Sequence, residues 1–149
     1  MTGRRKEAAS QPAGEARGPL ILIVDDFEDN RAMYAQFLTF SGFRVAEAAN
    51  GKEALETAAR LLPDLVVMDL SLPVMDGWEA TRRLKSDERT RGIPVLALTG
   101  HALGRHSQGA REAGCDGFVT KPCLPEDLVA EIRRLLEGGE PKPRRRGGA

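Results

Sequence analysis

The chain has 149 residues, of which 41% are hydrophobic and 30% are charged, a composition typical of one soluble globular domain. Its apolar runs are far shorter than the roughly 20 residues that a membrane helix needs, and no apolar stretch follows the basic residues near the N-terminus, so we expect neither a membrane span nor a secretory signal. The two cysteines, Cys115 and Cys123, lack the spacing of a metal or disulfide motif, which favours free thiols in the cytoplasm.

The formal net charge is zero, but the two ends of the chain are basic and the middle is acidic. Residues 1–18 hold four basic and two acidic residues, residues 138–149 hold four and one, and the remainder holds 14 and 19, a net charge near −5. An acidic core argues against nucleic-acid binding through the core. We expect a disordered tail over residues 1–18, one domain over 19–138, and a disordered basic tail over 139–149.

Strand and helix patterns begin to alternate at Pro19. Residues 20–24 form a continuous apolar run, typical of a strand buried on both faces. A helix opened by Asp29 and Asn30 follows, and its predicted inward residues are Met33, Tyr34, Phe37, Leu38 and Phe40. Residues 43–48 predict a second strand. The next helix is predicted to be capped by Asn50 and to carry Ala54, Leu55, Ala58 and Leu62 on its apolar face.

The alternation continues to Leu136. A third strand over 65–68 leads directly into Asp69, and Asp76 and Gly77 then begin a helix with Trp78, Thr81 and Leu84 inward. A fourth strand over 94–98 reaches Thr99.

The last three predicted elements are a helix over 102–113, a strand over 117–119 and a helix that begins at 125–127. Gly104 and Gly109 weaken the first of these, so we expect it to be the least stable element and to move most on phosphorylation. The last helix carries an apolar stripe of Leu128, Val129, Ile132, Leu135 and Leu136.

Five strands that alternate with five helices predict an α/β fold: a parallel sheet with helices on both faces and right-handed crossovers. In such sheets ligands bind outside the carboxyl ends of the strands, where the strand order reverses. Asp25, Asp26, Asp69 and Thr99 all lie at carboxyl ends of predicted strands. The strand order itself cannot be read from this pattern.

Three aspartates at one sheet edge predict a site for a divalent cation. Carboxylates that lie close together repel one another, and a hard cation such as Mg²⁺ removes that conflict by binding one or two of them. Successive strand side chains alternate, so of Asp25 and Asp26 we expect one to bind the ion directly and the other to act through water or to lie past the end of the strand. For this pair alone, capping of the following helix is the alternative.

A carboxylate beside a cation can also be a nucleophile toward phosphorus, and Asp69 is placed for this role. The charge on the phosphoryl oxygens would need a cation and an ammonium group, and Lys121 directly follows the fifth strand. Thr99 offers a hydroxyl to a phosphoryl oxygen. A Lys-Pro dipeptide or a threonine at a strand end is a weak signal alone.

The motifs ILIVDD, PDLVVMDLSLPVMDG, LALTG and GFVTKP occur in this order, and together they resemble the receiver domain of bacterial two-component response regulators, of the stand-alone type seen in chemotaxis receivers. The resemblance covers roughly residues 20–136. It implies a three-layer, flavodoxin-like (βα)5 fold with strand order 2-1-3-4-5.

The resemblance also implies a role for each site residue. Asp69 would be the phosphoacceptor, and Mg²⁺ (or Mn²⁺) would be bound by Asp26 and Asp69, by the carbonyl of Ser71, and by Asp25 as an assisting ligand or through water. Lys121 and Thr99 would contact the phosphoryl group.

Three further residues are expected to act in switching. Phe118 resembles the aromatic residue that rotates when the threonine moves, with a permanent core position as the alternative. Ser71 and His101 flank the site and are expected to tune the lifetime of the phosphoryl group.

These features predict a cytoplasmic response regulator that receives a phosphoryl group from a histidine kinase or histidine phosphotransfer protein. Only 13 residues follow Leu136, so we expect output through protein contact at the face of residues 102–113, strand 117–119 and the last helix, or onward phosphorelay. We expect a monomer or a weak phosphorylation-dependent dimer. We also expect no enzyme activity beyond self-phosphorylation and self-dephosphorylation.

Three alternatives remain at this point. A receiver-like adaptor would work without phosphorylation. An aspartyl-phosphate phosphatase would need a second acid two residues after the nucleophile, where this chain has Ser71. A flavodoxin-like cofactor binder would need a Ser-, Thr- or Gly-rich loop after the first strand, where this chain has DDFEDN.

Overall fold

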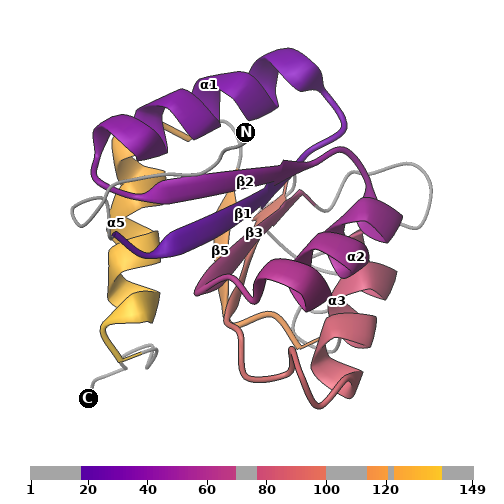
Figure 1. Cartoon of the computed structure of the whole chain (residues 1–149). Helices are drawn as coiled ribbons and strands as arrows, with labels where there is room; N and C mark the ends of the chain where they lie inside the picture. Colours follow the sequence, from indigo (N-terminus) through magenta and orange to yellow (C-terminus); the bar gives the residue numbers. More distant parts are fainter. Residues whose placement is uncertain (1–17, 70–76, 100–113, 121–122, 139–149) are drawn as a thin grey trace, which may run out of the picture.

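The computed structural model describes residues 18–69, 77–99, 114–120 and 123–138, which form a parallel sheet covered by helices (Figure 1). The strands are β1 Leu20–Val24, β2 Arg44–Ala48, β3 Leu65–Asp69, β4 Val95–Thr99 and β5 Gly117–Thr120. The helices are α1 Glu28–Phe40, α2 Gly51–Leu61, α3 Gly77–Ser86 and α5 Pro125–Leu136. The predicted helix over 102–113 and both predicted tails, apart from Gly18, lie outside the described residues.

The strand order is β2-β1-β3-β4-β5, and all four strand pairs are parallel. This order confirms the predicted fold class and the order that the receiver resemblance implied. From β1 the chain first adds β2 on one side and then β3 on the other, so the order reverses between β1 and β3. The carboxyl ends of these two strands are therefore where a ligand is expected in this fold.

Both faces of the sheet are buried, which explains the continuous apolar runs of the strands. Helices α1 and α5 cover one face of the sheet, and α2 and α3 cover the other (Figure 1). The side chains of Ile21 and Ile23 pack on the first face, and those of Leu22 and Val24 pack on the second. β3 alternates in the same way, and it ends in an aspartate. The apolar packing on both sides thus holds the carboxyl ends of β1 and β3 in place.

The predicted inward face of α1 is partly wrong. Tyr34 and Leu38 are buried as expected, but Met33 is 44% exposed and Phe40 is 89% exposed, and Ala35 is buried in their place. The reason is that α1 carries two apolar stripes with the same spacing. Residues 34, 35 and 38 face the sheet, while residues 33, 37 and 40 form a second stripe along the side of the helix. Of this second stripe, Phe37 is half-buried and packs against the core, as predicted.

The predicted start of α2 is confirmed. The Asn50 Oδ1 atom accepts a hydrogen bond from the Glu53 backbone N–H at 2.9 Å, and Glu53 Oε1 accepts one from the Ala49 N–H at 2.8 Å, which together make a capping box. The inward position predicted for Leu62 is wrong. Leu62 lies after the last helical residue with a φ of 50°, and it is 54% exposed because the chain has left the helical path.

The other two helices follow their predicted patterns. Thr81 and Leu84 of α3 are buried and Trp78 is half-buried, while α5 buries four of its five predicted stripe residues and leaves Leu136 half-buried. α1 begins at Glu28, one residue before the predicted start. Among the residues that the structure describes, no helix has the length and apolar character required to cross a membrane.

Candidate metal centre

Three carboxylates meet at the carboxyl edge of β1 and β3. One oxygen each from Asp25, Asp26 and Asp69 lies within 4.8 Å of the other two. Val24 pairs with Met68, and this register brings the next residue of each strand, Asp25 and Asp69, side by side. Asp25 is 1% and Asp69 2% exposed, whereas Asp26 is exposed to solvent.

Asp25 is held by its own backbone and side chain. Its N–H donates to the Ala48 carbonyl at 3.1 Å, which continues the pairing of β1 with β2 by one residue. Its Oδ1 atom accepts the Phe27 N–H at 2.9 Å, which turns the chain sharply after the strand. This turn lets two consecutive aspartates approach the same site, which a regular strand would forbid.

The alternative role of the acidic pair as a helix cap is contradicted. The N-cap residue of α1 is Phe27, and no side chain caps the helix by a hydrogen bond. Glu28 and Asp29 in the first turn place negative charge near the positive end of the helix dipole instead. The structure therefore assigns Asp25 and Asp26 to the carboxylate cluster rather than to a helix cap.

The donor set fits a hard divalent cation. It consists of oxygen only and carries up to three negative charges within a few ångströms, two of them on nearly buried side chains. Without a cation these charges repel strongly because burial lowers the effective dielectric constant. Mg²⁺ and Mn²⁺ prefer such oxygen ligands, whereas zinc sites usually include nitrogen or sulfur.

Arg31 is a feature of the site that the sequence did not reveal. Its guanidinium Nη1 donates to the Asp25 carbonyl at 2.7 Å, and its Nε donates to Glu47 Oε1 on β2 at 3.0 Å. The side chain is only 16% exposed. An arginine in the first turn of a helix is usually read as solvent-exposed, and nothing in the spacing of Arg31 and Glu47 marks them as partners.

Tyr34 connects α1 to the segment after β5. Its hydroxyl lies 3.9 Å from Cys123 Sγ. Burial raises the pKa of Tyr34 to about 12, with smaller contributions from Cys123 and from the charges of Asp25 and Asp69. The phenol is therefore neutral at physiological pH and belongs to the apolar wall beneath the carboxylates.

The structure describes two of the five remaining predicted site residues, Thr99 and Phe118. Thr99 is the last residue of β4, and because Asp69 pairs with Leu98, the Thr99 backbone lies at the same sheet edge as the carboxylates. Phe118 lies within β5 opposite Ala97, and its half-buried side chain packs against the core under α2 and α3. Ser71, His101 and Lys121 lie outside the described residues. Their predicted roles, and those of Thr99 and Phe118, stay predictions.

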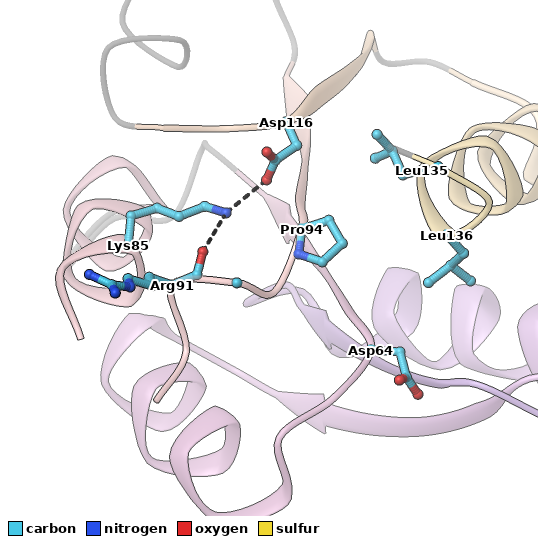
Figure 2. Close-up of a pocket in the computed structure, with 9 residues that line it drawn as sticks. Asp64, Lys85, Arg91, Pro94, Asp116, Leu135 and Leu136 are labelled. Carbon is cyan, nitrogen blue, oxygen red and sulfur yellow. Dashed lines mark hydrogen bonds and ion pairs between the residues drawn. The ribbon is translucent and has the colours of Figure 1, made fainter. Parts of the chain in front are cut away.

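A cavity of about 610 Å³ lies at the opposite, amino edge of the sheet (Figure 2). It is lined by the residues that precede β3, β4 and β5, which are Asp64, Pro94 and Asp116, and by residues of α3 and α5. Lys85 crosses it and donates to Asp116 Oδ2 at 2.8 Å and to the Arg91 carbonyl at 3.3 Å (Figure 2). Lys85 and Asp116 thus form an ion pair in this cavity, which lies far from the edge where this fold binds ligands.

Comparison with known proteins identifies the family. Residues 21–133 match the response regulator receiver domain. The chain belongs to the receiver family. The match spans both strands that supply the carboxylates and confirms the resemblance drawn from the sequence motifs.

Individual relatives agree with this assignment. The receiver is 34% identical over 116 residues to the polar-differentiation response regulator DivK of Brucella anthropi, a match that covers 78% of this chain and 94% of that protein. It shares 31% identity and a TM-score of 0.75 with the chemotaxis protein CheY4 of Vibrio cholerae, over 78% of this chain and 98% of that one.

A third similar structure bears on the metal. The receiver domain of the sensor histidine kinase PA1611 from Pseudomonas aeruginosa has a magnesium ion coordinated in its active-site cleft. It is 33% identical to this receiver with a TM-score of 0.76, over 81% of this chain and 99% of that one.

Proposed function

We propose that this receiver accepts a phosphoryl group on Asp69 from a histidine kinase or a histidine phosphotransfer protein in the cytoplasm, and that Mg²⁺ or Mn²⁺ assists. The observation that carries the proposal is the meeting of three carboxylates within 4.8 Å at the strand edge where the order reverses. The magnesium in the related PA1611 receiver supports the choice of cation.

The reaction is a transfer between two nucleophiles. An Asp69 carboxylate oxygen attacks the phosphorus of the donor phosphohistidine, the P–O bond forms as the P–N bond breaks, and the imidazole leaves and takes up a proton. Asp25, Asp26 and Asp69 would hold the cation, which would supply positive charge beside the phosphoryl oxygens. Lys121 and Thr99 are the proposed further contacts of those oxygens.

The apolar surface beside the site supports a protein as phosphoryl donor. Phe27 directly follows the acidic pair and is 56% exposed, and Met33, Phe40 and Leu124 are 44%, 89% and 60% exposed. Met33, Phe40 and Pro125 line a groove of about 260 Å³ between α1 and the start of α5. We propose that the phosphodonor protein covers this face, because it begins at Phe27 beside the acidic pair and runs along α1 to Phe40 at the far end of the helix. Large exposed apolar side chains of this kind favour burial in an interface.

The phosphoryl group is then the signal rather than a substrate. We propose that output passes through protein contacts at the face of α5, β5 and residues 102–113, or by onward phosphorelay, with a monomer or a weak phosphorylation-dependent dimer as the active form. The acyl phosphate carries a charge of about −1.5 to −2 where the carboxylate carried −1, and it adds acceptor oxygens. We propose that Thr99 and Phe118 move in response to this change. No turnover on an outside substrate is proposed beyond self-phosphorylation and self-dephosphorylation.

Acetyl phosphate provides the test, with intact-mass measurement as readout. Wild-type protein with Mg²⁺ should gain the mass of one phosphoryl group and lose the gain slowly, while Asp69→Asn should gain nothing. Asp64→Asn is the matched control, since Asp64 lies at the other end of β3 and the asparagine keeps an acceptor oxygen for the Leu20 N–H. A wild type that binds Mg²⁺ and gains no mass would favour the adaptor alternative over this proposal.

A further inference from the structure

The acidic cluster depends on one short segment of backbone between β1 and α1. Asp25 is buried and Asp26 is exposed, so packing fixes the first residue of this pair far better than the second. The position of the Asp26 carboxylate must then come from the backbone that carries it. The peptide unit that joins the two residues is planar, so a contact that fixes its carbonyl oxygen also orients the Asp26 Cα atom.

Arg31 makes that contact. Its Nη1 atom donates to the Asp25 carbonyl at 2.7 Å, a short charge-assisted hydrogen bond on a side chain that is 16% exposed. The backbone N–H of Arg31 in turn donates to the Phe27 carbonyl at 3.0 Å. The turn over residues 25–27 is therefore held from both sides by a single residue of α1.

Glu47 fixes the arginine itself. Its Oε1 atom accepts the Arg31 Nε–H at 3.0 Å from the neighbouring strand β2. The pair gives the guanidinium a fixed direction toward the Asp25 carbonyl, because a planar fork with two bound ends cannot rotate freely. The ion-pair partner that the structure records for Arg31 is thus Glu47 on β2.

We propose that Arg31 is a positioning residue for the divalent cation, and that the Arg31–Glu47 pair holds the Asp25–Asp26 peptide so that both carboxylates point at one ion. This inference rests on the proposed function, because it deepens the role of the same acidic cluster. Groups that orient metal ligands without touching the metal typically change affinity 10- to 100-fold when removed.

The test compares Mg²⁺ affinities of folded full-length variants by isothermal titration calorimetry. Arg31→Met should weaken Mg²⁺ binding about tenfold or more, and Arg31→Lys should weaken it less, because one ammonium group cannot bridge both acceptors. Arg133→Met is the matched control. Arg133 also donates to a backbone carbonyl, that of Ser41 at 3.0 Å, but it does so beyond the far end of α1, so its loss should leave the affinity unchanged.

A double-mutant cycle tests the pair. Glu47→Gln should weaken Mg²⁺ binding by itself and should add little in the Arg31→Met background, because both changes release the same carbonyl. If Arg31→Met does not fold, Arg31→Lys and Glu47→Gln carry the same test. Additive losses would contradict a shared role.

A second readout needs no metal. In metal-free protein, amide hydrogen exchange at Asp26 and Phe27 should be faster in Arg31→Met than in wild type, and unchanged in Arg133→Met. Wild-type Mg²⁺ affinity in a folded Arg31→Met protein would overturn the positioning role and leave the proposed function intact. If the wild type itself does not bind Mg²⁺, that result would contradict the proposed function, and the positioning role would fall with it.

Discussion

Asp26 differs from the other two carboxylates of the cluster in its exposure. Asp25 and Asp69 are nearly buried, and Asp26 faces solvent, where an arriving hydrated cation meets it first. Magnesium gives up its water reluctantly, so an exposed carboxylate is suited to bind it while several waters remain.

Replacing this carboxylate should separate metal binding from folding. Mg²⁺ at 100 times its dissociation constant should stabilise the wild type by about 2.7 kcal/mol, and Asp26→Asn should lose most of that gain at the same Mg²⁺ concentration. Without Mg²⁺ the variant should be as stable as the wild type or more stable, because one of three repelling charges is gone. Urea unfolding with and without Mg²⁺ measures both effects, and an equal Mg²⁺ gain in the two proteins would contradict this role.

Cys115 predicts a pH dependence of stability. Burial raises the pKa of its thiol from 9.0 to about 11, with a smaller contribution from the Asp116 charge. The native state keeps the thiol proton where the unfolded chain has lost it, so this contribution to stability is fully present below pH 9 and is lost between about pH 9 and 11. The free energy of unfolding of Cys115→Ala should therefore decrease less steeply over this pH range, by up to about 1 kcal/mol per pH unit.

Urea unfolding of both proteins from pH 8 to 11 tests this expectation. Cys123→Ala is the control for losing a thiol elsewhere in the chain. Equal slopes for wild type and Cys115→Ala would show that the Cys115 thiol does not contribute.

At the scale of the element, α1 has two apolar faces with different partners. One face packs on the sheet, and the other, which runs from Met33 to Phe40 at the far end of the helix, is exposed. Phe40→Glu should slow phosphoryl transfer from a phosphorylated histidine phosphotransfer protein by about tenfold, because it places a charge in the proposed donor interface. It should not affect the reaction with acetyl phosphate, which needs no docking surface.

Single-turnover transfer kinetics give the measurement. The free energy of unfolding should change by less than about 0.5 kcal/mol, since Phe40 is 89% exposed. Leu61→Glu on α2, whose side chain is 40% exposed, is the control for adding charge at another exposed apolar residue. Equal slowing by both variants would argue against a donor surface on α1.

The errors in reading α1 and α2 from sequence have a common cause. Apolar spacing identifies a helix and its stripe, but a helix with two stripes gives the same spacings, and only tertiary packing shows which stripe faces the sheet. Leu62 also fits the helical spacing of α2, but its φ of 50° ends the helix there, so its side chain does not follow the apolar stripe. Asn50 was predictable because its cap is local and needs no tertiary partner.

At the scale of the molecule, the two edges of the sheet have different roles. The carboxyl edge gathers three carboxylates, while at the amino edge Lys85 joins Asp116 to the carbonyl of Arg91 (Figure 2). Lys85 also donates to the carbonyl of Ile93. A like-charge cluster costs stability and is suited to function, whereas a paired charge that links α3 to the starts of β4 and β5 stabilises the fold.

Lys85→Met should therefore destabilise the protein without affecting the metal centre. We expect a loss of about 1–3 kcal/mol in the free energy of unfolding, because Asp116 and the Ile93 carbonyl lose a charged donor. Mg²⁺ affinity should stay unchanged. Lys52→Met at the exposed start of α2 is the control, and a stability loss equal to that of Lys85→Met would contradict the special role of Lys85.

The candidate site was predictable to the extent that strand ends define it. Parallel strands bring their carboxyl ends to one edge, so Asp25, Asp26 and Asp69 could be grouped from their places after apolar runs. The strand order came from the family resemblance, since no local pattern encodes it. Arg31 and its partner on β2 could not be found, because their contact depends on the β1–β2 pairing and on the rotation of α1 about its axis.

The central claim is that the phosphoryl group is carried by the side chain of Asp69, and chemical trapping tests it most directly. Borohydride reduces an aspartyl phosphate to homoserine, which peptide mass spectrometry locates by residue. After incubation with Mg²⁺ and acetyl phosphate, we expect homoserine at position 69 and unmodified aspartate at positions 25 and 26. Homoserine at another position, or its absence from protein that has gained one phosphoryl group, would contradict the assignment of Asp69 as the phosphoacceptor.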